Sequence, residues 1–195
     1  MTNFNVHTPA SAPEKSKGIL KMWQEKLGFL PNVFGVMAES PALAKGYSEL
    51  WGAYEAGSFS PVERCIINMT IDRLNGCDYC ASAHTTIGEK AGASKEVLSA
   101  LRDGKPLKDA KQEALHIFVS AVMKKLGRAD EKDLSAFYKA GYTKAHVLEV
   151  VLGISVVTIG NYVNHIAAPE LDKAFAPNRI ELGGKKHSGK SSHAA

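Results

Sequence analysis

The sequence has few cysteines and no long apolar run. Only 3 of its 195 residues are Cys, a low and odd number that disfavours a secreted, disulfide-held domain and favours a reducing cytoplasm. No run of 18 apolar residues is present, so we expect no membrane span and no membrane partner. The first residues also lack the apolar core of a signal peptide. We therefore expect a cytoplasmic globular protein.

Excess charge is scarce outside the C-terminal end. The formal net charge is +4, and the tail "GGKKHSGKSSHAA" holds three Lys and no acidic residue. Without this tail the chain is close to neutral, so we expect no nucleic-acid partner. Hydrophobic residues make up 45% of the chain, as in an ordinary globular domain.

The body of the chain shows helix signals throughout. A flexible arm is expected over residues 1–18, one domain over 19–180 and a disordered basic tail over 181–195. Ser-Pro pairs at residues 40–41 and 60–61 are typical of helix starts. Apolar residues recur at helical spacing, most clearly in "TKAHVLEVVLGISVVTIGNYVNHIA", and no alternating strand pattern appears. The sequence predicts an all-α fold.

Two segments resemble each other at an offset of 49 residues. "AGASKEVL" and "AGYTKAHVL" each place Gly at a helix end and Ser94 or Thr143 at the next helix start. A repeat of helical hairpins and ordinary capping chemistry both explain the likeness.

The segment "LNGCDYCASAHTT", residues 74–86, concentrates reactive side chains. On a helix, Cys77, Cys80 and His84 share one face, because they are three and four residues apart. Asn-Gly before them predicts a helix break, which places both cysteines in the first turn of the next helix. Unpaired N–H groups and the helix dipole favour a thiolate there, and a histidine one turn on can take a proton. This pattern is typical of a reactive dithiol.

Four other interpretations of the cluster can be tested against its spacing and its setting: zinc, c-type haem, a thioredoxin-type pair and core packing. Zinc needs a fourth ligand, which the fold would have to bring from Cys65, His116 or His165. A c-type haem site needs His directly after the second Cys, and a thioredoxin-type pair needs strands. The cysteines could also be small core residues beside a hydrogen-bonded histidine. We expect no metal and no organic cofactor.

The segment "SPVERCIINMTIDRLNGCDYCASAHT" resembles the core motif of the carboxymuconolactone decarboxylase and AhpD-like alkylhydroperoxidase family. "GFLPNVFGVMAESPALAKGYSEL" and "AGYTKAHVLEVVLGISVVTIGNYVNHIAAPELDKAF" are similar to its flanking regions, so the resemblance covers residues 18–176. It implies an all-α helical bundle that forms a homotrimer or homohexamer.

The resemblance also implies roles for the cluster. Cys80 attacks a small hydroperoxide and becomes a sulfenic acid, and Cys77 condenses with it to a disulfide. His84 belongs to the proton relay. A dithiol reductant protein then reduces the disulfide, which completes an antioxidant peroxidase cycle.

Two departures from the peroxidase branch weaken this expectation. Cys65 occupies the position of the relay glutamate, and Glu63, two residues earlier, lies about 200° round the helix. Tyr79 stands where the branch has histidine. Since acid–base assistance contributes about 10²–10⁴ in rate, we expect a weak peroxidase. Cys65 is either a third redox thiol or a buried helix residue.

One further motif offers supporting residues. "NYVNH" places Asn161 and His165 one turn apart at the end of an apolar helix. Both could line the site or hydrogen-bond a neighbouring subunit, but helix-end capping and packing is the favoured interpretation.

The sequence leaves three functions to compare. The first is a thiol peroxidase or dithiol oxidoreductase acting through Cys80 and Cys77. The second is a non-catalytic redox sensor or assembly protein with a C-x-x-C switch, which the absent glutamate favours. The third is a lyase of the decarboxylase branch, which the cysteine pair argues against.

Overall fold

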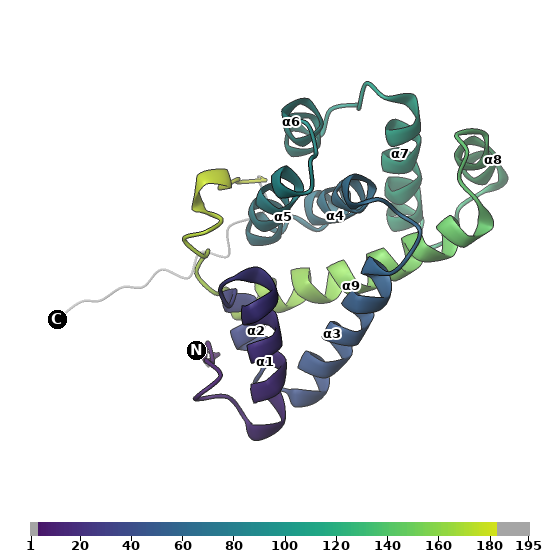
Figure 1. Ribbon diagram of the computed structural model, residues 1–195. Helices are drawn as coiled ribbons and strands as arrows, with labels where there is room; N and C mark the ends of the chain where they lie inside the picture. Colours follow the sequence, from purple (N-terminus) through teal and green to yellow (C-terminus); the bar gives the residue numbers. More distant parts are fainter. Residues whose placement is uncertain (1–3, 183–195) are drawn as a thin grey trace.

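The computed structural model describes residues 4–182, and every regular element in that part of the chain is helical (Figure 1). The predicted all-α fold is confirmed. In chain order the elements are α1 (Glu14–Leu27), α2 (Asn32–Met37), α3 (Pro41–Glu55), α4 (Pro61–Asn75), α5 (Asp78–Lys90), α6 (Lys95–Asp103), α7 (Ala110–Lys124), α8 (Glu131–Lys139), α9 (Lys144–Ala167) and the short 3-10 helix η1 (Ala176–Asn178).

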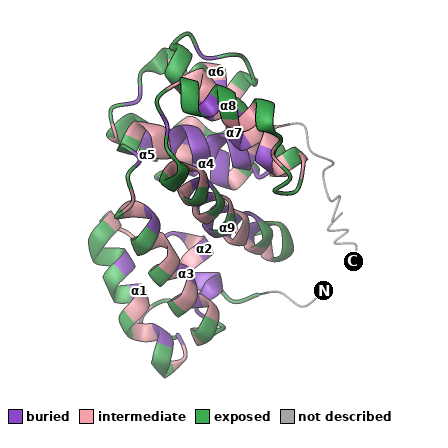
Figure 2. Ribbon diagram, turned by 90° about the vertical axis from the view of Figure 1, so that its right-hand side faces the viewer, coloured by how far each residue is buried: buried purple, intermediate pink, exposed green. Residues whose placement is uncertain are grey.

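Helix α4 forms the centre of the fold. It packs against α5, α7 and α9, and Figure 2 shows it as the most deeply buried helix in that view. Residues 65–72 are all buried. A helix enclosed on all sides needs no polar face, which explains the apolar, β-branched run "CIINMTI" in this segment.

The ends of α4 fix the turn that leads to the cysteines. Ser60 accepts from the backbone N–H of Glu63 at 3.2 Å, and the Glu63 carboxylate accepts from the Ser60 N–H at 2.9 Å, forming a capping box. At the other end Gly76 has φ +71°, a conformation that a side chain would strain. This left-handed turn lets the chain leave α4 and start α5 two residues later.

Helix α9 spans 24 residues and crosses beneath α4, with α3 on its other side (Figure 1). Helices α9 and α3 approach closely at Gly153, where an added Cβ would lie 2.9 Å from the Tyr54 ring. This approach seats α9 deep enough for Asn161 and Asn164 to reach the site described below.

By length and composition α9 is also the one helix of residues 4–182 that could cross a membrane. One third of its most apolar 18-residue window is buried in the fold. Core helices of soluble proteins pass the same test, so this property by itself is a weak indication.

The helical domain begins earlier in the chain than the sequence predicts. α1 begins at Glu14, inside the arm expected over residues 1–18, because Pro13 and an acidic first residue suit a helix start. The residues before it also contact the fold, since the His7 N–H donates to the Gly35 carbonyl at 3.1 Å. Of the disordered tail expected over residues 181–195, residues 183–195 lie outside the described part of the chain.

The two similar turns share one geometry. Gly92 and Gly141 have φ of +86° and +94°, and Ser94 and Thr143 then cap α6 and α9. Both turns therefore use the same capping chemistry.

After α9 the chain returns over α5. The Ile180 N–H donates to Ser82 Oγ at 3.1 Å, and the Leu182 N–H donates to Asp78 at 2.8 Å. Arg102 holds the same segment through the Asn178 carbonyl at 2.8 Å. The C-terminal segment therefore forms one wall beside the cysteine helix.

Candidate active site

The two cysteines start α5, as predicted. Cys77 is the N-cap residue, and its sulfur accepts from the Cys80 N–H at 3.3 Å. The two sulfurs lie at disulfide distance, with Cα atoms 5.4 Å apart. Only Cys80 lines the neighbouring pocket, whereas Cys77 is 1% exposed. A molecule in the pocket thus meets Cys80 first.

A buried carboxylate holds His84. Nδ1 of His84 lies 2.6 Å from Asp72 Oδ2, and Asp72 is fully buried on α4. The other carboxylate oxygen accepts from the Asn161 amide at 2.8 Å, and Asn161 in turn accepts from Asn75 at 2.8 Å. Because Nδ1 is engaged, the Nε2 nitrogen of His84 is the one left to exchange a proton.

Asn164 contacts the sulfur of Cys80. Its side-chain amide lies 3.1 Å from Cys80 Sγ and 3.0 Å from the Gly160 carbonyl, one turn back along α9. Its Oδ1 is buried with no hydrogen-bond partner among the described residues. Asn164 therefore donates toward Cys80 and leaves an acceptor buried beside it.

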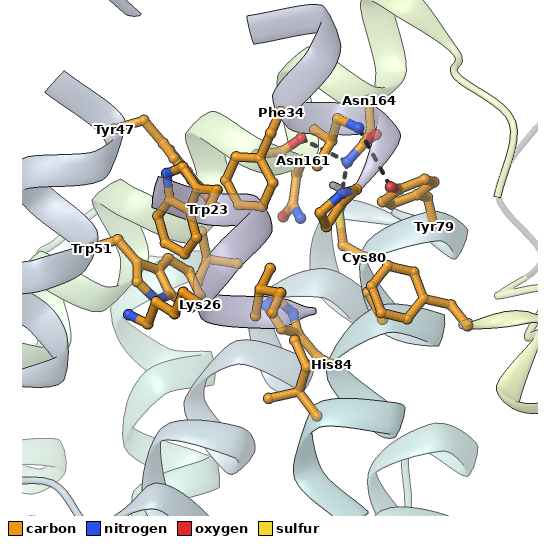
Figure 3. A pocket seen from close by; sticks show the side chains of 18 of the residues that line it. Trp23, Lys26, Phe34, Tyr47, Trp51, Tyr79, Cys80, His84, Asn161 and Asn164 are labelled. Atoms are coloured by element: carbon orange, nitrogen blue, oxygen red, sulfur yellow. Dashed lines mark hydrogen bonds between the residues drawn. The ribbon is translucent and has the colours of Figure 1, made fainter. Parts of the chain in front are cut away.

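A pocket of about 120 Å³ opens onto Cys80 and His84 (Figure 3). An engineered cavity of about 150 Å³ holds a benzene ring, so this space suits a small apolar molecule. Six aromatic side chains line it: Trp23, Phe34, Tyr47, Trp51, Tyr79 and Phe175. They come from α1, α2, α3, α5 and the C-terminal segment.

Two features shape the rim. The Trp51 ring lies parallel to the His84 ring, with centroids 6.0 Å apart and an interplanar angle of 6°. Lys26 forms an ion pair with Glu55, and its ammonium lies 5.0 Å from the Trp23 ring centroid. Since the charges at the rim are paired, the pocket favours an uncharged ligand.

Tyr79 lines the pocket but is tied to the fold. Its hydroxyl donates to the Asp172 carboxylate and accepts from the Val33 N–H at 3.4 Å. Burial, together with Asp172, raises the pKa of Tyr79 far above its usual range. It therefore stays protonated at neutral pH and joins α5 to α2 and the C-terminal segment.

Glu63 and Cys65 lie outside the pocket. The Glu63 carboxylate caps α4 and accepts from the Tyr142 hydroxyl at 3.0 Å. Cys65 is buried behind the site, 3.9 Å from the His84 carbonyl, and burial raises its pKa to about 12. Its thiol stays protonated at neutral pH, which makes a third redox thiol a poor interpretation.

The two residues proposed from "NYVNH" separate. Asn161 is fully buried against Asp72, whereas His165 is exposed and lies beside Tyr162, with ring centroids 6.5 Å apart. A step of four residues keeps side chains on one helix face only approximately. The contact with the core ends between these positions, so His165 is not part of the pocket.

Sequence reasoning missed Asp72 and Asn164. The signal for Asp72 was an acidic residue within the apolar run of α4, a position that requires a buried partner. Asn164 stood in the motif, yet only its neighbours Asn161 and His165 were selected.

No group of three or more His, Cys, Asp or Glu side chains that could hold a metal occurs within residues 4–182.

Comparison with protein families gives one match. Residues 41–107, which contain α3 to α6 and both site cysteines, match the carboxymuconolactone decarboxylase family. Among curated proteins none matches the chain.

Solved structures share the fold over most of the chain. An "alkylhydroperoxidase AhpD core: uncharacterized peroxidase-related protein" from Ralstonia eutropha JMP134 has a TM-score of 0.80 at 21% identity, covering 92% of this chain and 97% of its own. An uncharacterized peroxidase-related protein from Silicibacter sp. TM1040 gives 0.74 at 19%, covering 88% and 91%. A cysteine-to-alanine variant of the debrominase Bmp8, in complex with 2,3,4-tribromopyrrole, gives 0.77 at 19%, covering 91% and 96%.

Proposed function

We propose that the chain is a thiol-dependent peroxidase of the AhpD-like kind, starting from the match of residues 41–107 to the carboxymuconolactone decarboxylase family. The observation that carries the proposal is the Cys77–Cys80 pair at a helix start, with Cys80 at the wall of an apolar pocket. A lyase would have no use for two thiols at disulfide distance.

The first step oxidises Cys80. Nε2 of His84 takes the thiol proton, and the Asp72 carboxylate stabilises the imidazolium through Nδ1. The thiolate, held by Asn164, attacks the outer peroxide oxygen and the O–O bond breaks. The sulfur becomes a sulfenic acid, and the leaving alkoxide takes the proton back from His84 and departs as an alcohol.

The second step closes the disulfide. The Cys77 sulfur attacks the Cys80 sulfur, expelling the hydroxyl, which takes up the Cys77 proton and leaves as water. The 5.4 Å between the Cα atoms fits the bonded pair without backbone movement. A dithiol then returns both cysteines to the thiol form and is itself oxidised to a disulfide.

Asp72 supports activity despite the absent relay glutamate. Cys65 stands at the glutamate position, but a carboxylate from the same helix reaches His84 instead. We therefore propose that Asp72 supplies the negative charge that the relay needs, and that the loss of the glutamate does not abolish turnover.

A second candidate is reductive removal of halogen from a small aromatic ring. The aromatic wall of the pocket favours it, and the debrominase of the same fold is solved with a tribromopyrrole. The cysteine pair would supply two electrons and two protons, so that a carbon–bromine bond becomes carbon–hydrogen, with bromide and a proton released. Bromide release from 2,3,4-tribromopyrrole tests this activity directly.

A free-thiol count with peptide mapping tests the peroxidase. Reduced protein is treated with one equivalent of cumene hydroperoxide, and we expect fast loss of two thiols as a Cys77–Cys80 disulfide. Cys80→Ser should abolish this loss, whereas Cys65→Ser, the matched control, should leave it intact. Turnover is then followed with excess dithiothreitol as the reducing dithiol.

Loss of thiols no faster than for free cysteine would refute the proposal. Disulfide formation without turnover in excess dithiothreitol would favour the redox-sensor interpretation instead.

A further inference from the structure

One buried hydroxyl in the pocket has no hydrogen-bond partner among residues 4–182. Tyr47 on α3 lines the pocket and is only 7% exposed, yet its hydroxyl makes no hydrogen bond to any described residue (Figure 3). The two other buried tyrosines are paired: Tyr54 donates to Asn68 at 3.1 Å, and Tyr142 donates to Glu63 at 3.0 Å. Since buried polar groups are normally paired, the Tyr47 hydroxyl calls for a partner that the fold does not supply.

The Tyr47 hydroxyl is protonated and held in place. Burial raises the pKa of Tyr47 far above its usual range, and the charges of Asp72 and Glu55 raise it further. The ring of Tyr47 packs against Phe34 and Trp51, with centroids 5.7 and 5.9 Å apart. The group can therefore both donate and accept a hydrogen bond at neutral pH, from a fixed position.

Gly160 leaves open space beside this hydroxyl. Gly160 on α9 also lines the pocket, and an added Cβ would lie 3.5 Å from the Tyr47 oxygen. Apart from α9 itself, that Cβ would meet only Tyr47 within 4 Å. At Gly153, by contrast, an added Cβ would lie 2.9 Å from the Tyr54 ring, so there the glycine serves helix packing. The glycine at position 160 instead keeps the pocket open in front of the hydroxyl.

The same turn of α9 connects this hydroxyl to the sulfur of Cys80. The Gly160 carbonyl accepts from the Asn164 amide at 3.0 Å, and that amide lies 3.1 Å from Cys80 Sγ. A ligand that is bonded to Tyr47 therefore occupies the pocket onto which Cys80 opens.

We propose that the Tyr47 hydroxyl is a ligand-binding group and that the pocket takes a small phenol, an uncharged single ring with one hydroxyl. The volume of about 120 Å³ approaches that of a cavity of about 150 Å³ that holds benzene. Aromatic walls favour a ring, and a phenolic hydroxyl can donate to or accept from Tyr47. This inference concerns binding alone, so it does not depend on the proposed peroxidase activity.

Tryptophan fluorescence measures occupancy of the pocket directly. The chain has two tryptophans, Trp23 and Trp51, and both line this pocket. Reduced protein without peroxide is titrated with 4-methylphenol and with toluene, which has the same ring and methyl group but no hydroxyl. Both should give a saturable change in fluorescence, because both rings fit the aromatic wall.

Tyr47→Phe removes only the hydroxyl and tests its role. The dissociation constant of 4-methylphenol should rise about tenfold, while that of toluene should stay within about twofold of the wild-type value. Tyr54→Phe is the matched control, since it removes a buried hydroxyl from the same helix that is bonded to Asn68. The ratio of the two dissociation constants should not change in this control.

Gly160→Ala gives an independent test that keeps the hydroxyl. Its methyl group would lie 3.5 Å from the Tyr47 oxygen and partly cover it. Binding of 4-methylphenol should weaken relative to binding of toluene, and alanine suits a helix better than glycine does.

Two results would overturn the proposal. The first is a ratio of dissociation constants that neither Tyr47→Phe nor Gly160→Ala alters. The second is the absence of a saturable fluorescence change with 4-methylphenol in the wild type. Far-ultraviolet circular dichroism of each variant separates both results from misfolding.

Discussion

At the residue scale, polar side chains from α4 and α9 hold His84 and Cys80 on α5. Asp72 on α4 fixes His84, and Asn164 on α9 holds Cys80. The carboxylate and the amide are both buried, where their electrostatic effect is larger than in water. The surroundings of the cysteine pair therefore come from α4 and α9 as well as from α5.

Removing the charge of Asp72 tests this dependence. Asp72→Asn should lower kcat/KM for cumene hydroperoxide about 10²-fold, because the amide neither stabilises the imidazolium nor fixes the ring nitrogen that carries the proton. Stopped-flow peroxide consumption measures the loss.

Asp172→Asn is the matched control for this prediction. Asp172 is also a buried carboxylate near the pocket, but it contacts Tyr79 and the start of α2 instead of His84. The kcat/KM of the Asp172→Asn variant for cumene hydroperoxide should stay within a few-fold of the wild-type value. An equal fall in both variants would remove Asp72 from the relay.

At the element scale, the turn between α4 and α5 sets the position of both cysteines. Gly76→Ala should destabilise the protein by about 1–2 kcal/mol, because alanine strains at φ +71°. Urea unfolding followed by circular dichroism measures the change. Gly18→Ala, inside α1 with open space around it, should instead stabilise by about 0.5–1 kcal/mol. Equal effects at both sites would contradict the strain argument.

The α4–α7 contact should make stability depend on pH. His116 on α7 lies 2.8 Å from the Thr70 hydroxyl. Burial lowers the pKa of His116, and the positive charges of Lys124 and Arg73 lower it further. The carboxylate of Glu113 raises this pKa but does not outweigh burial. The unfolded chain then binds more protons, so stability is complete above about pH 6.5 and falls as the pH drops below it.

Replacing the titrating group tests this origin. His116→Gln keeps a hydrogen-bonding side chain but does not titrate, so its free energy of unfolding should change less between pH 7 and pH 5. Denaturant unfolding at several pH values gives the comparison. An unchanged slope would assign the pH dependence to other groups.

At the scale of the whole molecule, the pocket exists only because distant segments meet. Trp23, Trp51 and Phe175 reach it from α1, α3 and the C-terminal segment. The reactive pair belongs to one short stretch, but the space in front of it belongs to the entire fold. We therefore expect residues outside the cysteine motif to determine which substrates the pocket accepts.

The aromatic wall should favour bulky apolar peroxides. We expect a higher kcat/KM for cumene hydroperoxide than for hydrogen peroxide, and Trp51→Ala should lower this ratio about tenfold through lost apolar contact. Steady-state assays with both peroxides give the ratio. Tyr138→Ala, an aromatic change on α8 at the surface, should leave it unaltered. A ratio indifferent to Trp51 would place substrate binding elsewhere.

The sequence by itself determined the helical class, the main helix starts and the place of the cysteine pair. These properties are local: caps at Ser40, Ser60 and Thr143 satisfy nearby N–H groups, and apolar periodicity needs no distant partner. Cys77 and Cys80 share a helix start because of their spacing alone. Local chemistry of this kind is visible in one chain.

Only the tertiary structure decided which polar residues meet at the sulfur. Asp72 reaches His84 twelve residues away, and Asn164 reaches Cys80 across 84 positions. Neither pairing follows from helical spacing, because each depends on how α4, α5 and α9 pack. The exclusion of His165 and Glu63 has the same origin: helix packing decides which faces turn toward the pocket.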